Sequence, residues 1–482
     1  MKGPEHGRNR GMVLLLVATA IASLLCLWTA WCEFPVHAWN EARLIPAFAV
    51  RTGINPYPLI GGGPISTWIY GPVSLLINLP ATFASTAAGA LHVASLINFG
   101  VLLLPLACIF WSSAELKRRG AIVLWFGLTL AVLLIPRPNL VFHVADHAAI
   151  GFGLLSCWWL ARPPNPGSRA LATTAMLCTL AIWSKQVTVF LVAAQVTYLF
   201  VGDNRRAIEP YLLWLAVFNT AALGLSVLAF GWSNLWLNLV AIPGRLPWTD
   251  DVGARFALRS WALFAQIGLP CIGLVLLRAF HKWPIRSGES GRFFLITVLA
   301  FVAMLPMGIA GFLKIGGDTN LFHSWDYLMP GLLLAWLAAG KIGSGIWYRA
   351  AMVAICAIAI RWSDLTRFSA SPFTGHLEAA GSLLATHPHR LWFPRNPLIT
   401  YYADGKLWHS EDGIETRFLA NYGIREADFR RYLPPNLEGV VYPARTNFPF
   451  SMALLSEFSH EIKEPFWTLY VRPAATPGNA QK

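Results

Sequence analysis

The feature that most constrains this chain is a series of long apolar stretches separated by short clusters of Lys and Arg. The first stretch runs from Met12 to about Trp31, close to the roughly 20 residues that a helix needs to cross a bilayer. It is longer than the apolar core of a signal peptide, so we interpret it as an uncleaved first membrane helix. Only 13% of the residues are charged, against about 25% in a typical soluble domain. The pattern excludes a soluble enzyme, a disordered chain and a disulfide scaffold.

The basic clusters also predict how the chain crosses the membrane. Lys and Arg gather in cytoplasmic loops, and the net charge of +13 lies largely in such clusters, so we expect no nucleic-acid partner. With a cytoplasmic N-terminus, alternate crossings give about 11 membrane helices. The expected spans are 12–32, 88–111, 121–136, 143–161, 170–183, 186–201, 211–230, 259–277, 293–313, 325–340 and 347–360.

Composition divides the chain into two domains. Residues 1–360 are expected to form an all-α polytopic membrane domain with a large first outer loop at 33–87. The segment 361–482 holds 12 of the 24 acidic residues, and its runs Gly439-Val-Val-Tyr-Pro and Trp467-Thr-Leu-Tyr-Val are typical of strands. We therefore expect a small C-terminal α+β domain on the extracytoplasmic side.

Charged residues of the membrane domain gather at its outer face. Acidic groups at a membrane boundary are costly and usually mark function, a carboxylate can act as a general base, and Lys or Arg can neutralise a phosphate. This composition predicts a site for an anionic, membrane-embedded substrate. The acids expected there are Glu33, Glu41, Asp146, Asp250, Asp251, Asp318 and Asp326, and the cations include Arg43, Lys185 and Lys314.

The first outer loop is the most informative segment. It contains Asn40-Glu41-Ala42-Arg43, then Gly53, Pro56-Tyr57 and Tyr70-Gly71-Pro72. The residues before Gly53 favour a short helix lying on the membrane. The aromatic residues could form only an interfacial belt, and Glu41 with Arg43 could be only a local ion pair.

Three later stretches carry polar residues at the expected helix ends. His143, Asp146 and His147 share one face if the segment is helical; they could hold a metal, although lining a polar cavity is the simpler interpretation. Lys185 either reaches the membrane interface or contacts a phosphate. The stretch 314–320, which contains Lys314, Gly316, Gly317 and Asn320, either makes a turn or exposes backbone to a phosphate.

In this order, these motifs resemble the GT-C family of polytopic glycosyltransferases, which take sugars from polyprenyl-phosphate donors. The match in the first loop is an acid followed by Gly and Pro-Tyr, then Tyr-x-Pro. Together with the three later stretches, the matches extend from residue 33 to about 335. Asn40-Glu41-Ala42-Arg43 is similar to the Asp-Glu-Ala-Arg run of lipid A aminoarabinose transferases and protein mannosyltransferases, with Asn40 in place of Asp. That departure leaves the base open between Glu41, which we favour, and Glu33.

The resemblance implies inverting transfer of a hexosyl or pentosyl group at the outer face of the cell inner membrane. It implies catalytic roles for Glu41, Asp146 or Glu33, and donor phosphate binding by Arg43, Lys185 and Lys314. Substrate contacts are expected at Tyr57, Tyr70, His143 and Asn320. The expected partners are a polyprenyl-phosphate sugar, a lipid, polysaccharide or protein acceptor, and membrane lipids. Some relatives use a divalent cation and others none, so we assign no metal ligand.

Two other classes of protein fit part of this pattern. A transporter or lipid flippase also has outward loops and buried charges, but we find no inverted repeat in the sequence. A non-catalytic assembly subunit would share the composition and differ only in lacking activity.

Overall fold

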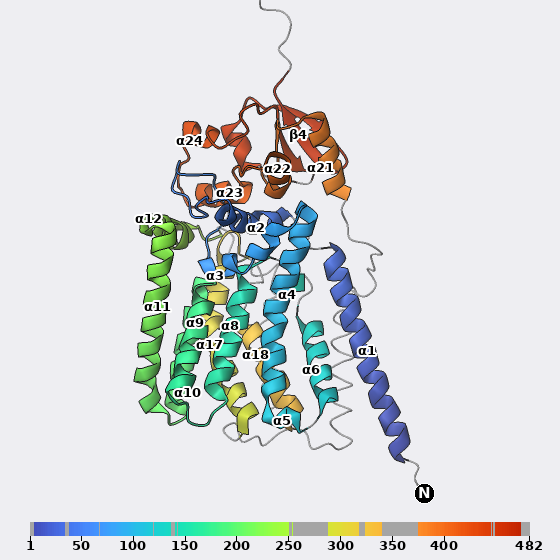
Figure 1. Cartoon of the computed structure of the whole chain (residues 1–482), viewed down its shortest axis with the longest axis vertical. Coiled ribbons are helices and arrows are strands. Elements are labelled where there is room, and N and C mark those ends of the chain that lie inside the picture. Colours follow the sequence, from blue (N-terminus) through green and yellow to red (C-terminus); the bar gives the residue numbers. More distant parts are fainter. Residues whose placement is uncertain are drawn as a thin grey trace, which may run out of the picture.

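The molecule has two layers along its long axis, a bundle of helices and a small α+β domain that covers one end of it (Figure 1). We call this end of the bundle the covered end. The computed structural model describes residues 4–33, 38–66, 68–118, 120–135, 140–141, 143–249, 253, 288–317, 323–339, 375–444, 446 and 449–473.

The helices of the bundle follow the expected spans closely. Nine of those spans contain a helix, and the other two, 259–277 and 347–360, lie outside the described residues. The helices are α1 (Pro4–Glu33), α4 (Ala87–Ser112), α6 (Ala121–Leu134), α8 (Ala145–Ala161), α9 (Ser168–Ile182), α10 (Phe190–Val201), α11 (Ile208–Phe230), α17 (Gly288–Leu313) and α18 (His323–Ala339).

Four segments among the described residues are long and apolar enough to cross a membrane. They are Val13–Glu33, Ala87–Ser112, Arg205–Phe230 and Gly288–Leu313. The remaining bundle helices are shorter, so the total of about 11 crossings stays a prediction.

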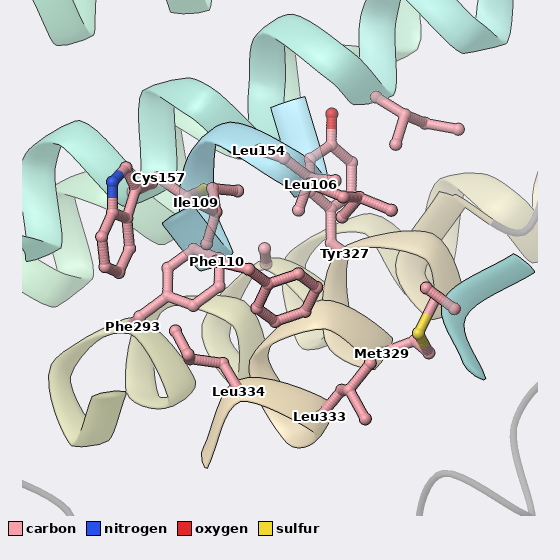
Figure 2. Packing of buried hydrophobic residues seen from close by; sticks show 14 of the residues in the cluster. Leu106, Ile109, Phe110, Leu154, Cys157, Phe293, Tyr327, Met329, Leu333 and Leu334 are labelled. Carbon is pink, nitrogen blue, oxygen red and sulfur yellow. The ribbon is translucent and has the colours of Figure 1, made fainter. Parts of the chain in front are cut away.

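Large buried side chains fill the centre of the bundle where α4, α8, α17 and α18 meet (Figure 2). The rings of Trp158 and Phe293 pack edge to face with centroids 5.2 Å apart. Small residues allow the close approach that helices in a bilayer need: a Cβ on Gly153 would lie 2.1 Å from the hydroxyl oxygen of Tyr327. That hydroxyl donates a hydrogen bond to the carbonyl of Ala149 at 3.0 Å.

Short elements connect the helices. At the covered end these are α2 (Ala38–Arg51), α3 (Pro72–Leu76), η1 (Leu79–Phe83), η2 (Gln186–Val189), α12 (Trp232–Trp236), η4 (Leu237–Ala241) and α13 (Ile242–Arg245). At the opposite end they are α5 (Ala114–Lys117) and η3 (Arg205–Ala207).

The short helix expected before Gly53 is confirmed as α2. Its surroundings differ from the expectation of a helix that lies on the membrane surface. It lies between the bundle and the C-terminal domain (Figure 1). Most of its apolar side chains are buried, although Trp39 is exposed, and the ring of Phe48 packs against that of Tyr401 with centroids 4.8 Å apart. The C-terminal domain therefore covers a surface that the sequence would leave to lipid and water.

The C-terminal domain is built around a four-stranded sheet of order β1-β2-β4-β3. β1 pairs in parallel with β2, whereas β2 and β3 pair antiparallel with β4. The two strands expected from the sequence are confirmed as β2 and β4. The elements are α21 (Gly375–Thr386), β1 (Leu391–Trp392), α22 (Pro397–Asp404), α23 (Glu411–Leu419), α24 (Glu426–Arg430), β2 (Gly439–Pro443), η7 (Phe450–Leu454), β3 (His460–Lys463) and β4 (Trp467–Val471).

Candidate functional site

Asp146 is the centre of a buried charged cluster at the covered end of the bundle. It lies in the first turn of α8 and its side chain is 7% exposed. The Nζ atom of Lys185 lies 2.7 Å from Asp146 Oδ1, and the Nε2 atom of His323 lies 2.9 Å from the same oxygen. Among the described residues, no hydrogen bond reaches the second oxygen, Oδ2. The sequence predicted Asp146 and Lys185 as site residues separately, and the fold brings them into contact.

Lys185 is itself almost fully buried, with 2% of its side chain exposed. It follows the C-terminus of α9, and its ammonium lies 5.4 Å from the ring centroid of Tyr70. An ammonium in such a place needs an anion or a ring face beside it. Asp146 and Tyr70 supply both, so the charge of the buried lysine is compensated by its neighbours.

Tyr70 reaches Lys185 because the first loop packs directly onto the turn after α9. A Cβ on Gly71 would lie 1.8 Å from the carbonyl oxygen of Trp183, so only glycine fits there. Val73 N–H donates to that carbonyl at 3.1 Å, and the side-chain amide of Gln186 donates to the carbonyl of Ile69 at 2.9 Å. The Tyr70-Gly71-Pro72 motif and the segment Lys185-Gln186 are therefore two sides of one contact.

Tyr57 supports this segment from within. Its side chain is fully buried, and its hydroxyl donates to the carbonyl of Tyr70 at 2.9 Å. Its ring packs edge to face on Phe230 with centroids 5.2 Å apart. A fully buried Tyr57 has no surface for a substrate, so its effect on binding would be indirect, by positioning Tyr70.

Glu41, the favoured base from the sequence, lies in the contact between α2 and the C-terminal domain. It is fully buried, and its two carboxylate oxygens accept hydrogen bonds from Asn396 Nδ2 at 2.7 Å and from Leu398 N–H at 3.2 Å. Burial raises the pKa of this carboxyl to about 7, although the hydrogen bonds from Asn396 and from the backbone of Leu398 and Ile399 oppose the shift. In this arrangement Glu41 caps the N-terminus of α22, where an anion is favoured.

Asn40, beside Glu41, connects α2 to the segment before α8. Its side-chain oxygen accepts a hydrogen bond from His143 N–H at 3.0 Å. His143 is 3% exposed, and its Nε2 lies 3.1 Å from the hydroxyl oxygen of Ser95. Arg43, one turn further along α2, stacks on the Trp39 ring at 5.2 Å. Asn40, which stands where the transferases that this sequence resembles have Asp, thus has a structural contact of its own.

The remaining predicted residues are spread around the cluster. Glu33 is exposed at the C-terminus of α1. Lys314 follows α17, donates to the carbonyl of Pro243 at 3.1 Å, and lies 5.6 Å from the Trp248 ring centroid. Predictions that fall outside the described residues are Asn320, Asp250, Asp251 and Asp318.

A metal centre has no support in the described part of the chain. It contains no group of three or more His, Cys, Asp or Glu side chains placed to hold a metal ion. His143 precedes α8, whose N-cap is Val144. His143 therefore does not share a helical face with Asp146 and His147, contrary to the expectation from their spacing.

Several important residues were missed by the sequence analysis. His323 is the first residue of α18, three residues before Asp326. The polar residues at the start of this apolar helix could have indicated His323 as a site residue. Arg417 of α23 is 1% exposed and donates to the carbonyl of Pro58 at 3.2 Å and to Asn238 Oδ1 at 2.9 Å. No local pattern could show that a C-terminal arginine binds the first loop.

The covered end also receives contacts from His409, which was not singled out in the sequence. Its Nδ1 accepts a hydrogen bond from Ile65 N–H at 2.7 Å, and its Nε2 lies 3.0 Å from the carbonyl oxygen of Phe429. Burial lowers the pKa of His409 to about 3. The first loop is thus held between the C-terminal domain and the charged cluster.

Known proteins offer only distant likenesses. No protein-family model matches the chain, and no curated protein matches it. Among solved structures, ArnT from Cupriavidus metallidurans bound to undecaprenyl phosphate is 15% identical over 97% of this chain and 99% of that chain, with a TM-score of 0.41. The archaeal oligosaccharyltransferase AglB from Archaeoglobus fulgidus, in complex with an inhibitory peptide and a dolichol-phosphate, is 11% identical over 92% and 70%, with a TM-score of 0.43. The Archaeoglobus fulgidus oligosaccharyltransferase tethered with an acceptor peptide is 12% identical over 92% and 69%, with a TM-score of 0.47.

Proposed function

We propose that this chain transfers a sugar from a polyprenyl-phosphate donor to an acceptor at the outer face of the cytoplasmic membrane. The observation that carries the proposal is the pairing of Asp146 with Lys185 at the covered end of an apolar bundle. Such a transfer needs a cation that stabilises the departing phosphate and a carboxylate that assists removal of a proton from the acceptor. Both groups lie together at the covered end of the bundle.

Asp146 is the carboxylate that the geometry favours among the three predicted from the sequence. Glu33 is exposed at a helix end, and both oxygens of Glu41 are occupied by the C-terminal domain. Asp146, in contrast, lies beside a buried lysine and retains an oxygen that no described residue binds. For Glu41 to act as the base, α22 would first have to move away from it.

Lys185 is the proposed partner of the donor phosphate. When the phosphate binds, it competes with Asp146 for the ammonium of Lys185. Arg43 and Lys314 lie on neighbouring elements and supply further positive charge at the same end. A single displacement at the anomeric carbon would invert its configuration.

The distribution of cations supports a cytoplasmic N-terminus and an extracytoplasmic C-terminal domain. Basic residues cluster at the end of the bundle opposite the C-terminal domain, as expected for cytoplasmic loops. Those in described elements or their connections include Lys117, Arg162, Arg169, Arg205, Arg206 and Arg292.

The test is release of polyprenyl phosphate from labelled polyprenyl-phosphate sugars by the whole protein in membranes, with crude acceptor lipids present. We expect Asp146→Asn and Lys185→Met to reduce cleavage by about 100-fold or more. Glu209→Gln, an exposed carboxylate at the opposite end, is the matched control and should keep full activity. Activity kept in Asp146→Asn but lost in Glu41→Gln would return the catalytic role to Glu41. Movement of the lipid without cleavage would favour a flippase.

A further inference from the structure

His323 is a second titratable side chain that lies beside Asp146 in the charged cluster. It is the first residue of α18 and is 2% exposed. Its Nε2 lies 2.9 Å from Asp146 Oδ1, within ion-pair distance but not aligned for a hydrogen bond, and its Nδ1 also has no hydrogen-bond partner among the described residues. Ser324, the next residue, is fully buried, and its hydroxyl also lacks a partner in the described part of the chain.

Unpartnered polar atoms are uncommon in buried positions because they lose hydrogen bonds to water without replacement. Two of them on successive residues, beside a lysine–carboxylate pair, indicate a place that a polar ligand fills. The acceptor of the transfer carries the hydroxyl or amine that such groups bind.

The negative charge of Asp146 beside Nε2 influences which nitrogen of His323 carries a proton. A carboxylate beside Nε2 favours the tautomer with a proton on that nitrogen, which leaves the lone pair on Nδ1. The same carboxylate would stabilise the imidazolium formed when Nδ1 takes a proton, as a carboxylate does in acyl-transfer enzymes. Asp146 Oδ1 is therefore suited to orient His323.

We propose that His323, oriented by Asp146, takes the proton from the acceptor during the transfer, a role that rests on the function proposed above. The acceptor oxygen or nitrogen attacks the anomeric carbon, and the bond from that carbon to the phosphate oxygen breaks. The bonding electron pair leaves with the phosphate, which Lys185 binds. The acceptor proton moves to His323 Nδ1 and later passes to water, so charge and protons balance without another reactant.

The charged and titratable groups that surround His323 all affect this step. Asp146 comes from α8, Lys185 from the turn after α9, and Asp326 from α18 itself. Tyr70 from the first loop lies over Lys185. Because the ordinary titration of an imidazole falls between pH 5 and 8, removal of His323 should change the pH profile of turnover in that range.

The experiment compares wild type, His323→Gln and His92→Gln in lipid nanodiscs with a labelled donor and an excess of acceptor. We expect His323→Gln to lower kcat by about 100-fold to 10,000-fold with the KM for donor changed less than about threefold. The limb of the kcat profile between pH 5 and 8 should disappear. His92 is the matched control, since it is half-buried in α4 and packs on Trp31, away from Asp146.

Each other result has a defined meaning. A His323→Gln enzyme that keeps both kcat and the pH profile of an active wild type would overturn the proposal and leave the transfer function standing. Wild type that cleaves no donor would overturn both. If His323→Gln does not fold, His323→Ala supplied with free imidazole replaces it; restored turnover supports the proposal, and a folded variant without rescue contradicts it.

Discussion

Glu41→Gln should change how the docking of α22 on α2 depends on pH. In wild type the buried carboxylate of Glu41 accepts hydrogen bonds from Asn396 and from Leu398 N–H. A glutamine has nearly the same shape but carries no charge at any pH. It also offers an NH2 group where one of these donors needs an acceptor, which costs about 1–3 kcal/mol.

The size of the pH effect follows from the pKa of Glu41. Docking raises that pKa from its usual 4.5 to about 7, so the docked state holds the proton more tightly than the undocked state. The favourable contribution of Glu41 is complete below pH 4.5 and is lost as the pH rises to 7. One pKa unit corresponds to about 1.4 kcal/mol, so the loss is about 3 kcal/mol over this window.

His409 acts in the opposite direction at a second contact, between the C-terminal domain and the first loop. Its pKa is lowered from 6.5 to about 3, so its contribution is present above pH 6.5 and is lost as the pH falls. Wild type alone could therefore show a shallow pH dependence. The difference between wild type and Glu41→Gln removes the effect of His409, because that residue is the same in both proteins.

The assay is hydrogen–deuterium exchange of the peptide covering α22 at several pH values, corrected for intrinsic exchange. We expect the protection of wild type relative to Glu41→Gln to fall by about a few hundred-fold between pH 4.5 and 7. Glu438→Gln, an exposed carboxylate of the same domain, should not change the profile of wild type. A constant difference between wild type and Glu41→Gln across this range would refute the reasoning.

Three further substitutions test the packing. Gly71→Ala should abolish donor cleavage, because its Cβ would overlap a backbone carbonyl at 1.8 Å, whereas Gly224→Ala in open space should not; equal activities would contradict this. Arg417→Met should lower the free energy of unfolding of the detergent-solubilised protein by about 2 kcal/mol, because hydrogen bonds to the first loop are lost. An unchanged Tm would argue against a stabilising role for these bonds. Gly153→Ala should cost about 1–3 kcal/mol by overpacking against Tyr327, measured in the same unfolding experiment.

The local pattern was sufficient to predict most of the architecture. Apolar runs and basic clusters placed nine of the expected helices, and two short runs rich in β-branched and aromatic residues located β2 and β4. It also identified Asp146, Lys185 and Tyr70 as separate candidates. These features are local because a bilayer or a sheet selects residues by their period along the chain.

The partners of each residue depend on contacts between distant segments. Glu41 meets Asn396 across 355 positions, Lys185 meets Asp146 across 39, and Arg417 meets Pro58 across 359. No spacing rule covers such distances, so the sequence could not separate a carboxylate that docks a domain from one that faces a lysine.

The sequence by itself determined that the chain is a helical membrane protein with charges at one end of its helices, because transfer from water to lipid acts on each segment separately. The tertiary structure alone decided which charges pair, since that depends on how helices and loops pack. Packing places Glu41 under α22 and brings Asp146 together with Lys185 and His323. The chemistry of the site is therefore a property of the assembled fold.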